Sequence, residues 1–204
     1  ILAVIEGLQA AAAKGLLHRD IKPANCFVDS DGTVKIGDFG LSISTLSREE
    51  TQLTAAGSFL GTPSFASPEQ LEGKKLDVRS DIYAVGATLY YLLTGTPPIE
   101  AEGTVQLSAR ILKENPKSPG NLRPEIPKGL SRAILRCLEK DSEKRFSNYA
   151  ELKERLRPFS SSSPIPADLK IRFVAGSFDF LSILTAAFVL VKLPLFAFGL
   201  SLTK

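Results

Sequence analysis

The spacing of apolar and polar residues predicts a mainly helical chain with one small β-hairpin. Residues 81–93 are apolar on nearly every side of a helix, which indicates a buried helix that ends at Gly95. Short apolar runs at residues 26–28 and 33–36 predict two strands, and the DSDG sequence between them predicts the turn. Helical periodicity predicts further helices over residues 1–17, 105–114, 130–139 and 148–156.

Three other segments lack this periodicity and suggest how the chain is divided. Residues 41–65 are rich in Ser, Thr and Gly, and this loop is too long for a passive connection. Residues 159–170 form a Ser/Pro-rich linker with nothing to pack. We therefore expect a folded domain over residues 1–158 and a separate apolar segment over residues 171–204.

Composition narrows the class of protein. Apolar residues make up 44% and charged residues 23% of the chain, which is the balance of a folded domain and excludes wholly disordered or coiled-coil chains. The formal net charge of +3 is small, so no nucleic-acid partner is expected. The two cysteines, Cys26 and Cys137, match no metal-ligand spacing and are expected to be reduced thiols.

The most specific motif lies in two adjacent pieces. Residues 18–25 read HRDIKPAN and residues 38–40 read DFG. A DFG sequence alone usually marks an ordinary turn, but the two pieces at this spacing are too specific for chance. Together they resemble the catalytic half of bacterial serine/threonine protein kinases of the eukaryotic type. The resemblance extends to about residue 159 and implies the large helical lobe of that fold, with its small β-hairpin at the catalytic loop.

The resemblance implies a role for each residue of the motif. Phosphoryl transfer needs a positioned nucleophile and cations that absorb charge on the phosphate oxygens. Asp20 would receive or orient the proton of the substrate hydroxyl, and Lys22 would reach the γ-phosphate of ATP. Asn25 and Asp38 would hold Mg²⁺, which prefers oxygen ligands. Phe27 would lie under the adenine, although packing in the core fits this position equally well.

Two neighbours of Asp20 have competing interpretations. His18 is the only histidine and invites assignment as a general base, but in the family this position packs against the DFG phenylalanine, here Phe39. Arg19 resembles the arginine that pairs with a phosphorylated activation loop, and the alternative is an ordinary surface arginine.

A second motif supports the same resemblance. Residues 61–69 read GTPSFASPE and resemble the segment that closes the activation loop and receives the substrate residue. In that comparison Thr62 would hydrogen-bond near the catalytic aspartate, and Glu69 would form a buried ion pair with Arg145. Asp81 resembles the helix carboxylate that holds the catalytic-loop backbone, and it is also a candidate N-cap of the following apolar helix.

Seven Ser and Thr residues lie in the long loop between Gly40 and Gly61. A phosphate there would add a charge of about −1.5 to −2, which Arg19 could bind. The sequence therefore favours autophosphorylation at Thr51, Thr54 or Ser58, with a second copy of the chain as partner. The alternative is an ordinary polar loop.

The small lobe of the kinase fold has no counterpart in this sequence. No Gly-rich phosphate loop or strand lysine precedes the catalytic loop, and the chain starts at Ile1 without any methionine. We therefore expect a fragment that is inactive alone, from a parent that transfers the ATP γ-phosphate to Ser or Thr hydroxyls of proteins. The alternatives are a catalytically silent pseudokinase and a small-molecule phosphotransferase, which residues 61–69 disfavour.

The apolar segment after the linker is expected to cross a lipid bilayer. Between Ile171 and Leu202 its only charged residues are Arg172, Asp179 and Lys192, and a span needs about 20 mostly apolar residues. The first part, with Arg172, Ala175 and Asp179, resembles the start of the RDD family of bacterial membrane domains. This implies a kinase lobe on the cytoplasmic side of the inner membrane. The alternatives are an apolar helix packed on the lobe, or a transporter or sensor that the kinase controls.

Overall fold

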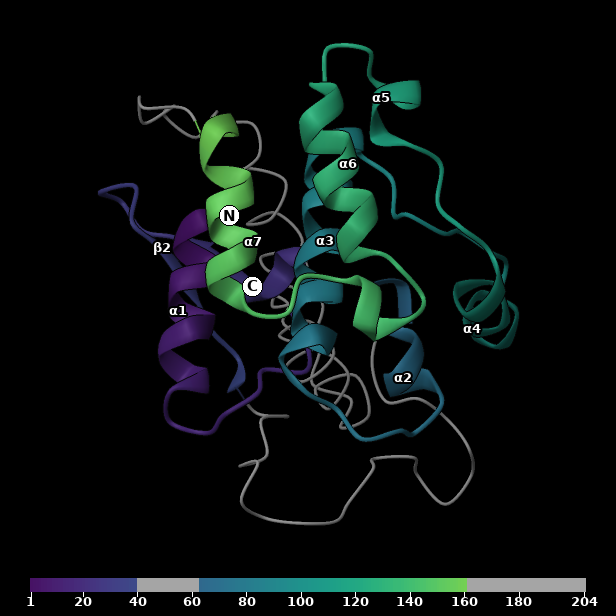
Figure 1. Cartoon of the computed structure of the whole chain (residues 1–204), viewed down its shortest axis with the longest axis horizontal. Helices are drawn as coiled ribbons and strands as arrows, with labels where there is room; N and C mark the ends of the chain where they lie inside the picture. The colour runs from purple at the N-terminus through teal and green to yellow at the C-terminus, as the bar shows by residue number, and fades with distance from the viewer. Residues whose placement is uncertain (40–62, 161–204) are drawn as a thin grey trace, which may run out of the picture. The chain divides into compact units, whose positions relative to one another are not determined.

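The computed structural model describes residues 1–39 and 63–160, which belong to the first of the two units into which the chain divides, Ile1–Ser162. This part is mainly helical, with one two-stranded antiparallel sheet (Figure 1). Its helices and strands are α1 (Leu2–Ala12), β1 (Cys26–Val28), β2 (Val34–Ile36), α2 (Pro68–Leu71), α3 (Val78–Thr94), α4 (Thr104–Lys113), α5 (Pro119–Leu122), α6 (Lys128–Cys137) and α7 (Tyr149–Leu156). Short 3₁₀ turns are η1 (Pro23–Asn25), η3 (Pro63–Phe65), η4 (Ser142–Lys144) and η5 (Arg157–Phe159).

The predicted hairpin is confirmed. Strands β1 and β2 pair antiparallel, with Cys26 opposite Ile36. The turn closes where the Gly32 N–H donates to the Asp29 carbonyl at 2.9 Å, and Gly32 takes a φ of 84°, which favours glycine. Phe27 on β1 is 52% exposed, so packing in the core is excluded for this side chain.

Helix α1 is shorter than its composition predicts. It ends at Ala12, and Gly15 then takes a φ of 72°, which turns the chain toward the next segment. The Ala- and Leu-rich run up to residue 17 is therefore partly a turn, because helix propensity alone does not hold the last residues against this glycine. The buried side chains of α1 are Val4, Ile5 and Leu8.

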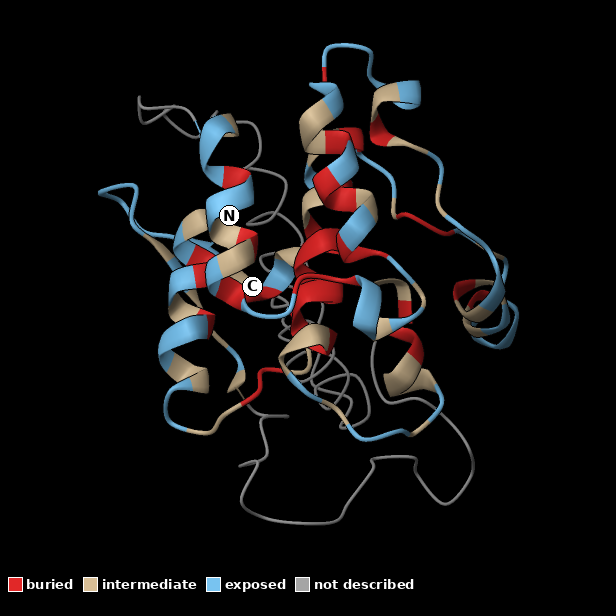
Figure 2. Cartoon of the chain, viewed as in Figure 1, coloured by how far each residue is buried: buried red, intermediate tan, exposed pale blue. Residues whose placement is uncertain are grey.

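Helix α3 is the buried helix that the apolar run predicts, and Figure 2 shows it as the most deeply buried of the helices. It begins one turn earlier than expected because Asp77 is the N-cap, with its carboxylate accepting the Arg79 N–H at 2.8 Å. The N-cap interpretation of Asp81 is therefore wrong. The helix ends at Gly95 with a φ of 82°, as predicted.

Residues of α3 contribute to both apolar clusters of the core. Ile82 and Val85 pack with α1 and α7, whereas Ala87 and Tyr90 pack with α4 and α6. The contact between α3 and α6 is close, because a Cβ atom added at Gly86 would lie 2.4 Å from the Cβ of Cys137. Helix α3 is thus packed on one side against α1 and α7 and on the other against α4 and α6, and this packing positions its buried polar residues.

The three predicted amphipathic helices are confirmed as α4, α6 and α7, each with bounds shifted by one or two residues. The short helices α2 and α5 were not expected. Cys26 and Cys137 are free thiols, as predicted. Within residues 1–39 and 63–160, no helix is both long enough and apolar enough to cross a membrane, and the apolar segment over residues 171–204, which is predicted to cross a bilayer, lies outside the described residues.

Candidate active site

The backbone of the HRDIKPAN segment is held by one buried carboxylate on α3. Asp81 is 1% exposed, and it accepts the backbone N–H of His18 on Oδ2 at 2.9 Å and that of Arg19 on Oδ1 at 2.8 Å. The Tyr149 hydroxyl donates to the same Oδ2 at 2.9 Å. Burial raises the pKa of Asp81 above its ordinary value, and the three hydrogen bonds offset only part of that rise. The predicted attachment of the loop to Asp81 is confirmed.

Arg19 adopts a strained backbone conformation that its neighbours maintain. Its φ of 68° is unusual for a residue with a side chain and costs about 1–3 kcal/mol. Both of its peptide groups are bound, because Asp81 accepts its N–H and the Gln70 side chain donates to its carbonyl at 2.7 Å. The guanidinium Nε of Arg19 is buried and has no partner among the described residues.

Gln70 was not identified from the sequence as a residue that supports the site, although a local pattern predicts its role at a helix start. Ser67 and Gln70 form a capping box at the start of α2, in which the Ser67 N–H donates to the Gln70 side chain at 3.0 Å. A Ser followed three residues later by Gln predicts such a helix start. That the same amide would also reach Arg19, 51 residues away, is a tertiary fact that the pattern does not contain.

Three predicted site residues lie together at the end of the loop. The Lys22 ammonium donates to Asp20 Oδ2 at 2.7 Å. The Asn25 amide nitrogen donates to the Asp20 carbonyl at 2.8 Å and to Asp20 Oδ2 at 3.2 Å. Asp20 Oδ1 and Asn25 Oδ1 have no hydrogen-bond partner among the described residues. The cluster therefore presents a carboxylate oxygen, an amide oxygen and a cation.

The hairpin links the DFG piece of the motif to Asn25. The Gly37 N–H donates to the Asn25 carbonyl at 2.9 Å, so the residue before Asp38 is bonded directly to Asn25. Asp38 is exposed, with a φ of 58° and no hydrogen bond within residues 1–39 and 63–160. The adjacent strands thus join two motif pieces that are separated in the sequence.

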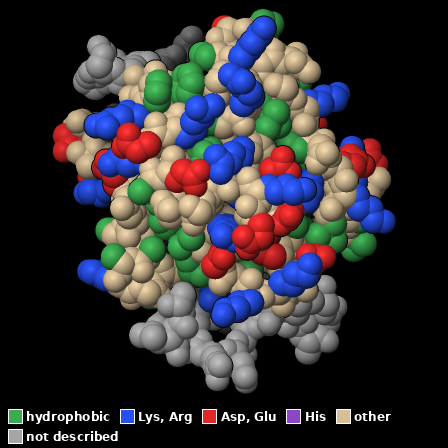
Figure 3. Space-filling view, viewed as in Figure 1, with side chains coloured by type: hydrophobic (Ala, Val, Ile, Leu, Met, Phe, Trp, Pro, Cys, Tyr) green, Lys and Arg blue, Asp and Glu red, His purple; other side chains and the backbone are tan. Residues whose placement is uncertain are grey.

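His18 connects the loop to the same region, and it is a core residue as predicted. Its ring lies 4.5 Å from the Phe39 ring, centroid to centroid, with an interplanar angle of 56°. Its Nε2 donates to the Gly37 carbonyl at 2.9 Å, and its Nδ1 accepts the Asp20 N–H at 3.4 Å. The side chain is 0% exposed. Accordingly, no histidine is visible on the face shown in Figure 3, where positively and negatively charged side chains are interspersed. A fully buried ring cannot serve as a base for an external substrate.

The predicted ion pair of Glu69 and Arg145 is confirmed. Two parallel hydrogen bonds join Arg145 Nη1 to Glu69 Oε1 at 2.6 Å and Arg145 Nη2 to Glu69 Oε2 at 2.8 Å. The guanidinium also donates to the carbonyls of Glu139, Arg79 and Lys140, so all five of its N–H groups are used. Burial alone would raise the pKa of Glu69, but Arg145 and the Ser80 hydroxyl outweigh it and hold the pKa below its ordinary value.

Four predicted residues of the activation loop lie outside the described residues: Thr51, Thr54, Ser58 and Thr62. Phe27 lies on β1 beside Gly37, where a Cβ atom on the glycine would lie 2.8 Å from the phenylalanine ring. The structure thus brings Asp20, Lys22 and Asn25 together, bonds the residue before Asp38 to the Asn25 backbone, and anchors the start of the loop through Asp81.

Comparisons with known proteins agree with this geometry. Residues 1–156 match a family model described as protein kinase domain. A probable serine/threonine-protein kinase PknB of Lactococcus lactis is 37% identical over 152 residues, which is 74% of this chain and 24% of that protein. The serine/threonine-protein kinase pkn3 of Myxococcus xanthus is 39% identical over 161 residues, which is 76% of this chain and 29% of that protein. The chain spans about a quarter of the length of the curated relatives it matches.

The buried ion pair gives a prediction about stability. Replacing Arg145 by Met should lower the free energy of unfolding by about 3–5 kcal/mol, because Glu69 is left as a buried charge without its partner. Since the folded-state pKa of Glu69 is depressed, the pair stabilises above the ordinary carboxyl pKa, and this contribution is lost as the pH falls through the folded-state value. Urea unfolding of wild type and variant at several pH values should show a difference that shrinks in acid.

Arg110→Met is the matched control, because Arg110 pairs with Glu114 on the surface of α4. Exposed pairs contribute little, so this variant should unfold like the wild type. Equal free energies of unfolding for Arg145→Met and Arg110→Met would show that the buried pair stabilises the fold no more than the exposed pair does.

Proposed function

The chain belongs to the protein kinase family, and on that premise we propose that it forms the catalytic lobe of a serine/threonine protein kinase. The protein would transfer the γ-phosphate of ATP to Ser or Thr hydroxyls of proteins. The observation that carries the proposal is the cluster of Asp20, Lys22 and Asn25, joined by hydrogen bonds of 2.7–3.2 Å on a backbone that Asp81 fixes. The names of the relatives support the choice of Ser and Thr over other acceptors.

Asp20 has the position expected of the residue that handles the substrate proton. Its Oδ2 is occupied by Lys22 and Asn25, which orient the carboxylate and leave Oδ1 to accept the hydroxyl proton. The Lys22 ammonium, held 2.7 Å from that carboxylate, would supply a positive charge to the phosphoryl group as it gains negative charge. Each side chain therefore positions the other.

Two oxygen-bearing side chains, Asn25 and Asp38, would hold the magnesium ion. Asn25 turns its amide nitrogen toward Asp20, so its Oδ1 remains for a cation. Asp38 offers a carboxylate without a hydrogen bond in the described part of the chain, and hard oxygen donors are what Mg²⁺ prefers. When bound, Mg²⁺ would neutralise charge on the phosphate oxygens of ATP.

The role of Asp20 is testable in the intact protein, including whatever precedes Ile1. Asp20→Asn should lower the rate of phosphate transfer to a protein substrate by about 10²- to 10⁴-fold, because the proton acceptor is lost. ATP binding, measured by titration calorimetry, should change little. Asp31→Asn is the control, because Asp31 lies in the exposed hairpin turn, where its carboxylate accepts the Thr33 N–H at 2.9 Å and binds no residue of the cluster. A wild-type protein that binds ATP without transferring phosphate would instead indicate a pseudokinase.

Autophosphorylation of the activation loop forms part of the proposal. The buried Nε of Arg19 lacks a partner among the described residues, and a phosphate group is a ligand that guanidinium groups bind well. Mass spectrometry of the intact protein after incubation with Mg²⁺ and ATP should find phosphate on Thr51, Thr54 or Ser58. An active preparation with all three unmodified would contradict this part, and the Asp20→Asn protein supplies the unmodified reference.

The apolar segment over residues 171–204 would tether the lobe to the inner membrane, with the lobe on the cytoplasmic side. The support is its sequence, in which Phe180 to Val191 carry no charged residue, and its resemblance to the start of an RDD domain. Fractionation of cells that express the chain should place it in the membrane fraction, resistant to carbonate washing. A matched chain that ends at Ser160 should be released, and equal fractionation of the two chains would contradict the tether.

A further inference from the structure

Tyr149 on α7 connects the last helix of the lobe to the catalytic loop. Its hydroxyl donates to Asp81 Oδ2 at 2.9 Å, and the two residues are 68 positions apart in the sequence. The side chain is 3% exposed and lies in the same apolar cluster as Ile82 and Phe146. The sequence pattern does not predict this contact, because a Tyr on an amphipathic helix can face either the core or the solvent.

We propose that Tyr149 is a positioning residue for phosphoryl transfer, which acts on the catalytic loop through Asp81. The inference rests on the proposed kinase function and extends it to a residue outside the motifs. Asp81 Oδ1 binds the Arg19 N–H, and Oδ2 binds both the His18 N–H and the Tyr149 hydroxyl. The third donor fixes the plane of the carboxylate, so the two loop N–H groups meet their oxygens in one orientation.

The loss of this donor would leave the buried Asp81 carboxylate with one hydrogen bond fewer. A buried carboxylate needs its hydrogen bonds, since burial disfavours its charged form. When a carboxylate takes up a proton, one of its oxygens becomes a donor, so the group no longer accepts one loop N–H on each oxygen. The backbone at Arg19, with its φ of 68°, would then lose part of what maintains it. Asp20 follows directly, so its carboxylate would move away from Lys22 and the substrate.

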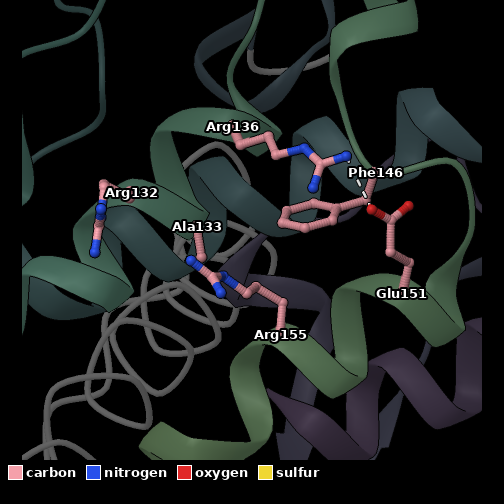
Figure 4. A pocket seen from close by; sticks show the side chains of 6 residues that line it. All are labelled: Arg132, Ala133, Arg136, Phe146, Glu151 and Arg155. Carbon is pink, nitrogen blue, oxygen red and sulfur yellow. Dashed lines mark ion pairs between the residues drawn. The ribbon is translucent and has the colours of Figure 1, made fainter.

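The position of Tyr149 is itself fixed by contacts along α7. The Asn148 side chain caps the helix by accepting the Glu151 N–H at 2.9 Å. Figure 4 shows Glu151 facing Arg136 of α6. The two side chains form an ion pair of 2.8 Å. The Arg136 guanidinium also lies 4.1 Å from the centre of the Phe146 ring. These groups line a hollow of about 340 Å³ between α6 and α7. The N-cap at Asn148 and the packing of Tyr149 in the apolar cluster therefore position the first turn of α7, which carries Tyr149.

The groups that face this site define the expected pH dependence. Asp81 is bordered by His18 and the Arg19 N–H from the loop and by Tyr149 from α7, and Asp77 lies at the start of its own helix. Burial and the negative charge of Asp81 raise the pKa of Tyr149, so the phenol keeps its proton and remains a donor throughout the working range of pH. Without that donor the pKa of Asp81 rises further, so activity should be lost at a higher pH than in the wild type.

The test uses Tyr149→Phe in the intact protein, which removes one oxygen atom and retains the ring. At neutral pH kcat should fall by about tenfold, the scale of one hydrogen bond to a charged group, with KM for ATP changed less than about twofold. The acid limb of the kcat profile should move to higher pH. Tyr90→Phe is the matched control, because Tyr90 is equally buried, on the other side of α3, and should retain the wild-type profile.

Hydrogen–deuterium exchange gives a readout that does not depend on activity. The amides of His18 and Arg19 should exchange faster in Tyr149→Phe than in Tyr90→Phe, at a temperature where both proteins are folded. A double-mutant cycle with Asp81→Asn completes the test, since Tyr149→Phe should have little further effect on kcat once Asp81 is changed.

Three results would overturn the inference: a wild-type kcat and pH profile in Tyr149→Phe, unchanged amide exchange at His18 and Arg19, or additive effects in the cycle. These results differ from the one that would contradict the proposed kinase function, which is a wild-type protein that does not transfer phosphate. If Tyr149→Phe lowers the melting temperature more than Tyr90→Phe, the amide exchange and the cycle decide the question.

Discussion

The arrangement of the site depends on one buried carboxylate, that of Asp81. Helix α3 carries it into a core where a charge without partners would cost several kcal/mol. Three donors from two other parts of the chain compensate for that cost: two backbone N–H groups of the catalytic loop and one phenol of α7. Because the loop supplies backbone rather than side-chain donors, its conformation is fixed directly, and the strained residue Arg19 is held where Asp20 needs it.

The sequence predicted the parts of this arrangement that depend on local pattern. The apolar run identified α3, the DSDG turn identified the hairpin, and the family motifs identified the pairing of Glu69 with Arg145 and the packing of His18 on Phe39. Errors arose where two local signals competed. The helix-forming run before Leu17 was interrupted by Gly15.

Tertiary hydrogen bonds were beyond what a sequence pattern contains. Gln70 bonds to a carbonyl 51 residues away, and Tyr149 to a carboxylate 68 residues away. A polar residue on a half-buried helix has the same local pattern whether it faces water or a distant partner, so periodicity cannot distinguish the two. In the case of Gln70, the sequence pattern predicts the capping box with Ser67, but it does not predict the hydrogen bond to the Arg19 carbonyl.

Neighbouring residues of α3 connect two regions that a kinase must coordinate. Ser80 donates to Glu69, the last residue of the GTPSFASPE segment, and Asp81 binds the backbone of the HRDIKPAN loop. Successive residues on a helix point about 100° apart, so one turn of α3 reaches both regions at once. Helix α3 also packs closely on α6, because a Cβ atom added at Gly86 would lie 2.4 Å from the Cβ of Cys137. One turn of α3 therefore contacts both the end of the GTPSFASPE segment, through Ser80, and the backbone of the HRDIKPAN loop, through Asp81, so the relative position of the two segments depends on this helix.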